Sequence, residues 1–170
     1  MNLKKIFEMQ KDLDKAIISR NDIDASNSKI SQAEFDEMKL LATLVETAEF
    51  ANEVQSFKYW KANKSINREK ALEEFADMLH FVGSFAYKYN VDPDIEPLIL
   101  SDNVNKQICL LFSTISSAIN NLNKYVISQM LAIALGVAKL LNYSEDEIIH
   151  WYYIKNKKII FINKAKSTTS

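Results

Sequence analysis

Residues 31–55 read SQAEFDEMKLLATLVETAEFANEVQ and predict one long helix. Ser31 followed three residues later by Glu34 is a capping-box pattern, which marks the start of a helix. Apolar side chains then recur at helical spacing, and neither glycine nor proline interrupts them. Residues 67–89, NREKALEEFADMLHFVGSFAYKY, predict a second long helix with Asn67 as its N-cap. We expect these two helices to pack antiparallel and to organise the fold.

The rest of the chain predicts four more helices, at about residues 3–20, 104–120, 125–141 and 145–165. Residues 21–29 form a predicted polar loop, and residues 90–97 hold both prolines. Only two glycines and two prolines occur in 170 residues, against average usage near 7% and 5%. No segment shows the two-residue alternation of a strand. We therefore predict an all-α, single-domain bundle of about six helices over residues 1–165, followed by a disordered tail at 166–170.

Composition limits the classes of partner and compartment. The net charge of -1 gives no basic field that would attract nucleic acid. Cys109 is the only cysteine, which excludes a disulfide framework and fits a reducing cytosol. The N-terminus becomes charged again too soon for a signal peptide, and the longest apolar runs are too short to span a membrane. We expect a cytoplasmic protein that binds neither nucleic acid nor membrane.

The helices predicted at residues 104–120 and 125–141 are apolar nearly all round. Such helices must be covered on most sides. In a domain of this size, part of the cover is expected to come from a second subunit. The sequence thus predicts a homodimer.

Two predicted helices each carry a pair of acids three residues apart, Glu46 with Glu49 and Glu74 with Asp77. Residues at this spacing project from one face of a helix, about a turn apart. Antiparallel packing would bring four carboxylates to one point, which is hard to tolerate without divalent cations. Hard oxygen ligands suit Mg²⁺ or Mn²⁺ rather than zinc. The implied chemistry is transfer of a phosphoryl group of a polyphosphate to water.

Each acid pair is expected to border a buried apolar stripe. The first stripe comprises Met38, Leu41, Val45 and Ala48, and the second comprises Leu72, Phe75, Met78, Leu79 and Val82. A plain structural bundle remains the alternative, because acid pairs at this spacing are also common on solvated helices. Under that alternative, Glu49→Ala and Asp77→Ala would be neutral or stabilising.

The residues around the acid pairs narrow the interpretation. Phe57-Lys58-Tyr59-Trp60 lies between the pairs, and His80-Phe81 follows the second pair. With E-x-x-E before and E-x-x-D after, this pattern resembles the dimeric all-α dUTPase family of the MazG-like nucleotide pyrophosphohydrolases. The close resemblance covers about residues 8–85.

The resemblance implies Mg²⁺-dependent hydrolysis of dUTP, and also of dUDP, with dUTP giving dUMP and pyrophosphate. Glu46, Glu49, Glu74 and Asp77 would hold the metal, with Mn²⁺ as a substitute. Glu49 and Glu46 are the candidate catalytic residues, and Glu49 is the preferred base for a metal-activated water.

The same resemblance supplies candidate substrate-binding residues. Gln10 would read the base, Trp60 would stack on it, and Lys58 would meet a phosphate. The complete set also contains Lys61, His80, Phe81, Lys155 and Asn156.

The last predicted helix departs from the family pattern. Lys155 and Asn156 match its start, but Ile159 or Ile160 stands where a second asparagine is expected, and no arginine follows. Lysine lacks the planar fork with which arginine grips phosphate. Two alternatives therefore stay open: a MazG-like pyrophosphohydrolase for another nucleoside triphosphate, and a catalytically weakened nucleotide-binding or regulatory homologue.

Overall fold

The computed structural model describes residues 1–18 and 30–167 of the chain. These residues form six helices and no strand, which confirms the all-α prediction. Asn2 and Asp94 form an isolated antiparallel bridge. The helices are α1 Lys4–Ile18, α2 Gln32–Val54, α3 Arg68–Lys88, α4 Val104–Ser117, α5 Lys124–Leu140 and α6 Glu145–Ser167.

The predicted helix starts are confirmed by their caps. Ser31 and Glu34 form both hydrogen bonds of a capping box at the start of α2. Asn67 caps α3, and Ser144 and Glu147 form a second capping box at the start of α6. The predicted loop at residues 21–29 lies outside the described residues. Helix α6 extends through Lys166 and Ser167, and the remainder of the predicted tail is also outside the description.

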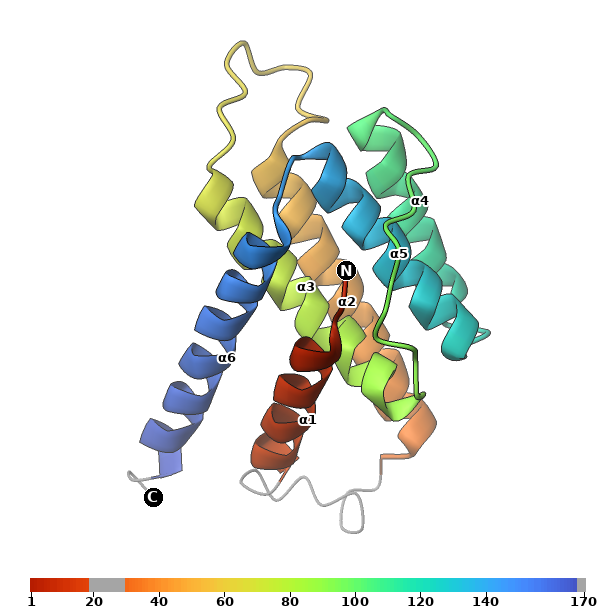
Figure 1. Cartoon of the computed structure of the whole chain (residues 1–170), viewed down its shortest axis with the longest axis vertical. Helices are drawn as coiled ribbons and strands as arrows, with labels where there is room; N and C mark the ends of the chain where they lie inside the picture. The colour runs from red at the N-terminus through yellow and green to blue at the C-terminus, as the bar shows by residue number, and fades with distance from the viewer. Residues whose placement is uncertain (19–29, 168–170) are drawn as a thin grey trace.

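The centre of the bundle is the antiparallel pair α2 and α3 (Figure 1). Helix α3 packs against α1, α2, α5 and α6, and α4 packs against α2 and α5. In Figure 1, α1 and α6 lie side by side in front of the central pair, while α4 and α5 cover another side. This arrangement leaves the acid-bearing faces of α2 and α3 toward α1 and α6.

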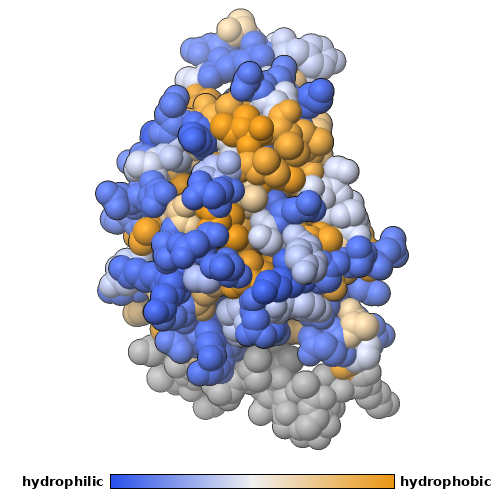
Figure 2. Space-filling model, turned by 45° about the vertical axis from the view of Figure 1, so that its right-hand side comes forward, coloured by the Kyte–Doolittle hydropathy of each residue, from blue (hydrophilic) through white to orange (hydrophobic). Residues whose placement is uncertain are grey.

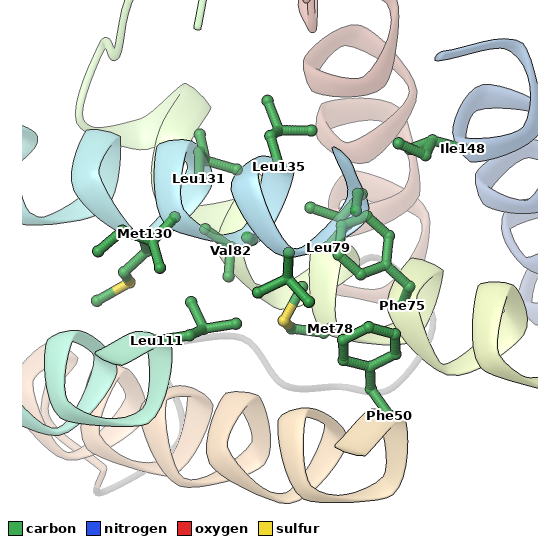
Figure 3. Close-up of a cluster of buried hydrophobic side chains, with 14 of the residues drawn as sticks. Phe50, Phe75, Met78, Leu79, Val82, Leu111, Met130, Leu131, Leu135 and Ile148 are labelled. Carbon is green, nitrogen blue, oxygen red and sulfur yellow. The ribbon is translucent and has the colours of Figure 1, made fainter. Parts of the chain in front are cut away.

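The hydrophobic core joins α2 and α3 to α4, α5 and the start of α6 (Figure 3). Phe50 and Phe75 pack with ring centroids 5.2 Å apart, and both side chains are fully buried. Burying an aromatic side chain of this size stabilises a fold by about 2–3 kcal/mol. The second predicted stripe, on α3, is confirmed because all five of its side chains are buried. Helix α3 is therefore held rigidly, and its acids are held with it.

The predicted apolar stripe of α2 is not its buried face. Met38, Leu41 and Val45 are 57%, 63% and 48% exposed, and Ala48 is exposed as well. The buried face instead contains Leu40, Thr43, Thr47, Phe50, Ala51 and Val54. The threonine hydroxyls donate to the carbonyls of Lys39 and Thr43 one turn earlier, so their polar atoms are satisfied inside the helix. Hydropathy alone therefore points to the wrong side of α2.

The apolar residues of α4 and α5 are mostly covered by their own chain. Leu111, Ile115 and Met130 are fully buried, and most apolar side chains of α5 are buried too. On α4, Leu110 and Phe112 are half-buried, and Ile119 just beyond its end is 50% exposed. The sequence argument for a second subunit is therefore weakened at α5, whereas α4 leaves some apolar surface uncovered, and the homodimer stays a prediction. Figure 2 shows the α4 side of the molecule, where an apolar area in the upper half is bordered by hydrophilic side chains.

Within residues 1–18 and 30–167, no single helix is both long and apolar enough to cross a membrane. One bent pair, Lys124–Leu140 with Glu145–Phe161, meets the length and composition test at an angle of 115°.

Candidate active site

Three of the four predicted metal-ligating acids converge between α2 and α3. Glu46, Glu74 and Asp77 each present a carboxylate oxygen within 4.8 Å of the others, and all three are half-buried. The convergence follows from the antiparallel register, which places Glu46 of α2 opposite Asp77 of α3. Packing has therefore brought together groups that would repel one another if all were ionised.

Glu49 lies outside this group of three. It is exposed on α2, one turn beyond Glu46, yet its charge still raises the pKa values of Glu46 and Glu74. The fourth predicted ligand is thus at the rim of the cluster.

The electrostatics of the cluster favour protonation or a bound cation. Burial, followed by the charges of Asp77, Glu49 and Glu74, raises the pKa of Glu46 to about 7. Burial likewise raises the pKa of Glu74 and, against the opposing effect of Lys155, that of Asp77. A divalent cation would supply the missing positive charge.

Lys155 of α6 reaches the edge of the cluster. Its Nζ lies 2.5 Å from Asp77 Oδ2 and 3.0 Å from Glu73 Oε1. Burial alone would lower the pKa of Lys155, but the hydrogen bonds to the two carboxylates outweigh burial and raise it. Asp77 keeps a raised pKa despite this partner because its burial outweighs the effect of Lys155, and the charge of Glu73 adds to the rise. Glu73, by contrast, has its pKa lowered by the hydrogen bond from Lys155.

A cavity of about 520 Å³ opens beside the acids. Its volume is typical of a site for a small organic ligand. Glu46 and Asp77 line one part of the cavity, and the remaining lining comes from α1, α2, α3 and α6. The lining residues are Gln10, Leu13, Asp14, Ile17, Phe35, Met38, Lys39, Ala42, Glu46, Asp77, His80, Phe81, Ser84 and Ile159.

A polar network lines the part of the cavity farthest along α3 from the acids. Ser84 lies seven residues after Asp77, which is about 10 Å along the helix. Asp14 accepts hydrogen bonds from Gln10 Nε2 at 2.6 Å, Ser84 Oγ at 2.5 Å and Tyr87 OH at 2.7 Å. Lys39 Nζ donates to Ser84 Oγ at 2.7 Å and lies 3.9 Å from Asp14 Oδ2. This carboxylate is therefore fully compensated by the chain itself.

Gln10 and His80 line the cavity but are tied to one another. Gln10 Nε2 faces the Asp14 carboxylate, which cannot donate, so this end of the amide must be the NH₂ group. Gln10 Oε1 therefore accepts from Tyr152 OH at 2.5 Å and from His80 Nδ1 at 2.8 Å. Burial and the charge of Lys155 lower the pKa of His80 to about 4. The ring is thus neutral, with its proton on Nδ1, and it stacks on Tyr152 at a centroid distance of 4.1 Å.

The structure does not bring Lys58, Trp60 and Lys61 to the cavity. They lie between α2 and α3, where Lys58 Nζ donates to Asn52 O and Lys61 Nζ donates to Gln55 Oε1. Trp60 is 62% exposed and makes edge contacts with Phe57 and Tyr59.

The remaining predicted substrate-binding residues fall into two groups. Phe81 lines the cavity, whereas Asn156 is buried and donates to Met9 O at 3.3 Å, tying α6 to α1. Ile159, one of the two isoleucines found where the second asparagine is expected, also lines the cavity.

Four polar residues near the cavity or cluster were missed by sequence reasoning: Asp14, Lys39, Glu73 and Ser84. The position of Asp14 four residues after Gln10 was an available signal, because this spacing places both on one face of α1. Lys39, Glu73 and Ser84 carry no such local signal, since their partners lie on other helices.

The donor set fits a hard divalent cation. Glu46, Glu74 and Asp77 offer only carboxylate oxygens, the ligands that Mg²⁺ and Mn²⁺ prefer. The geometry as a whole defines an all-α protein with a carboxylate cluster beside a cavity for a small organic ligand, a combination suited to polyphosphate chemistry.

Comparison with protein families identifies the family to which this all-α protein belongs. The family model described as dUTPase matches residues 2–164, nearly the whole chain. The chain therefore belongs to the dUTPase family, and this membership supports a role as a nucleotide pyrophosphohydrolase. A comparison with curated proteins gave no match.

Proposed function

We propose that this protein is a dUTP diphosphatase that hydrolyses dUTP to dUMP and pyrophosphate and also accepts dUDP. The observation that carries the proposal is that Glu46 and Asp77 belong both to the three-carboxylate cluster and to the wall of the cavity. A nucleotide with its phosphates at the acids would have its nucleoside in the cavity.

Different residues of the chain would hold the metal, accept the proton of water and contact the phosphates. Glu46, Glu74 and Asp77 would hold Mg²⁺, which when bound supplies positive charge for the phosphate oxygens and acidifies water. Glu49, exposed at the rim and outside the group of three, takes the proton of the attacking water. Lys155 donates to a phosphate oxygen. The water oxygen bonds to the α-phosphorus as the bond from that phosphorus to the bridging oxygen breaks, and pyrophosphate leaves with that oxygen.

The nucleoside would lie along α3 between the cluster and the Asp14 network. Phe81, Met38 and Leu13 provide apolar wall against which the nucleoside would pack. Gln10 and His80 contribute polar atoms to the same wall. Lys58, Trp60 and Lys61 have no part in this account of the free subunit.

The proposal is tested by pyrophosphate release from dUTP, dUDP, dCTP and dTTP with and without Mg²⁺. We expect Mg²⁺-dependent turnover with dUTP preferred, and a loss of about 10²-fold or more for Glu49→Gln, because a general base typically contributes that much. Glu69→Gln is the matched control, since Glu69 is an exposed acid in the first turn of α3. Turnover without Mg²⁺ would contradict the proposal. Turnover of dCTP and dTTP as fast as that of dUTP would contradict it too.

The dUTPase proposal includes a homodimer in the cytoplasm. The exposed stripe of Met38, Leu41 and Val45 on α2 supports the dimer, because large exposed apolar patches mark interaction surfaces. Sedimentation equilibrium of wild type and Leu41→Glu tests it. We expect a dimer that the charged variant converts to monomer, whereas a monomeric wild type would reject this part of the proposal.

Ile159 favours a second candidate function, a nucleotide-binding homologue with weakened hydrolysis. An isoleucine at the cavity wall cannot hydrogen-bond a sugar or phosphate as an asparagine would. Calorimetry with Mg²⁺ and a non-hydrolysable dUTP analogue distinguishes the two, because tight binding without turnover is the distinctive result of the second.

A further inference from the structure

Lys155 is pinned between two carboxylates at the edge of the acid cluster. Its side chain is 13% exposed, and its Nζ contacts both Asp77 and Glu73 of the neighbouring helix α3. Asp77 and Glu73 lie one turn apart on the same face of α3, so one ammonium group can bridge them. Lys158, one turn along α6, lies 3.5 Å from Glu73.

The two partners of Lys155 differ in their relation to the cluster. Asp77 belongs to the group of three carboxylates that could hold a metal ion, and Glu73 does not. A divalent cation at that group and the ammonium of Lys155 would compete for the Asp77 carboxylate, because like charges at such distances repel strongly. The contact of Lys155 with Asp77 is therefore weakened when the cation binds, whereas its contact with Glu73 can remain.

We propose that Glu73 is a positioning residue: it draws the Lys155 ammonium away from Asp77, so that the metal can bind while Lys155 stays at the rim of the site. The proposal rests on the proposed function for its metal and substrate. Lysine has three N–H donors, so one bond to Glu73 leaves two for phosphate oxygens. Asp77 is the nearer partner, at 2.5 Å against 3.0 Å for Glu73, so without Glu73 the ammonium would contact Asp77 alone and compete more strongly with the metal.

The contacts of Glu73 distinguish a positioning role from direct electrostatic attraction between this acid and the metal. Glu73 is 29% exposed, and its pKa is lowered first by the hydrogen bond from Lys155, then by the charge of Lys155, and less by Lys158. A remote acid would attract a divalent cation whether or not Lys155 were present. A positioning acid acts through Lys155, so its effect must depend on that lysine.

A double-mutant cycle tests this dependence by titrating Mn²⁺ and measuring the free ion by electron paramagnetic resonance. The proteins are wild type, Glu73→Gln, Lys155→Met and the double variant, each without nucleotide. We expect Glu73→Gln to weaken Mn²⁺ binding and Lys155→Met to strengthen it. The effect of Glu73→Gln should be larger by about fivefold or more when Lys155 is present, as for residues in direct contact.

Three further measurements keep the interpretation secure. Glu73→Asp should restore most of the lost affinity, because it keeps the carboxylate on the same face. Lys158→Met is the matched charge control and should change Mn²⁺ affinity less than Lys155→Met, since Lys158 contacts Glu73 but not Asp77. Circular dichroism melting of every variant checks that α6 remains folded against α3.

The outcomes distinguish this inference from the proposed function. Additive effects of Glu73→Gln and Lys155→Met, with Mn²⁺ still bound, overturn the positioning role and leave the metal site standing. A failure of wild type to bind Mn²⁺ at millimolar concentration overturns the metal site and the inference with it. With dUTP and Mg²⁺, the positioning role also requires Glu73→Gln to raise the Mg²⁺ concentration for half-maximal rate more than it lowers kcat.

Discussion

Asp14 and Asp77 are two carboxylates on the wall of one cavity, and the chain treats them in opposite ways. Both side chains are largely buried, at 11% and 17% exposure. Asp14 accepts three hydrogen bonds and has a lysine nearby, so it is compensated within the fold. Asp77 shares one lysine with Glu73 and faces two further acids. The Asp14 carboxylate therefore stabilises the fold, whereas the cluster of Glu46, Glu74 and Asp77 has too little positive charge of its own and suits a divalent cation.

The largest expected effect is a loss of activity when Asp77 of the acid cluster is substituted. Asp77→Asn should lower kcat/KM for dUTP hydrolysis by about 10²-fold or more. It removes a carboxylate that would hold the metal, and the metal would stabilise negative charge on the reacting phosphate. Without Mg²⁺, its thermal stability should equal or exceed that of wild type, since one of several crowded acids is neutralised. Full activity in this variant would remove the basis for treating the two ends differently.

The equivalent aspartate-to-asparagine substitution at Asp14 should change the stability of the fold. Asp14→Asn should lower the free energy of unfolding by about 3 kcal/mol, because it breaks a buried hydrogen-bond network and leaves Lys39 without its counterion. Urea denaturation measures this. Asp12→Asn on the same helix is the control and should change little, since the Asp12 side chain is 82% exposed. A loss as small as that of Asp12→Asn would show that the network contributes little.

Addition of Mg²⁺ should also distinguish the acid cluster at Asp77 from the hydrogen-bond network at Asp14. Mg²⁺ at 100 times its dissociation constant should stabilise the wild type by about 2.7 kcal/mol, since it binds only the folded state. Asp77→Asn should lose most of this stabilisation, and Asp14→Asn should keep it. Thermal melting with EDTA and with Mg²⁺ measures the difference, and equal Mg²⁺ responses of the two variants would contradict the comparison.

The smallest expected effect is a pH dependence at Glu46. Its pKa is about 7 in the folded protein against an ordinary value of 4.5, so the stability present at acidic pH is lost as the pH rises from about 4.5 through 7. Glu46→Gln should therefore melt like wild type at pH 5 and at higher temperature than wild type at pH 8, both in EDTA. We expect a difference of about 1 kcal/mol, because solvent screens a half-buried group. Mg²⁺ should abolish the advantage of the variant, and a difference that is equal at both pH values would argue against a raised pKa.

Local sequence patterns predicted the helices well because their signals act over three or four residues. The Ser31–Glu34 and Ser144–Glu147 capping boxes and the Asn67 cap mark real helix starts. The spacing of Glu74 and Asp77 also placed both on one face of α3, as it must in any helix.

The errors arose where hydropathy had to stand for packing. Met38, Leu41 and Val45 form a regular apolar stripe, yet α2 turns Thr43 and Thr47 toward the core instead. Trp60 and Lys58, by contrast, were expected at the substrate through resemblance. The connection that carries them lies away from the cavity within this subunit, and their role stays a prediction.

The sequence by itself determined the all-α class, the helix starts and the acid pairs, because each depends on neighbours within one helical turn. Only the tertiary structure decided which acids meet, since Glu46 and Asp77 converge through the antiparallel register of two helices. It alone paired Lys155 with Glu73 and Asp77, and Asp14 with Ser84 and Tyr87, because these residues are about 70 or more positions apart in the chain. Contacts at that separation follow from how whole faces pack, which no local spacing encodes.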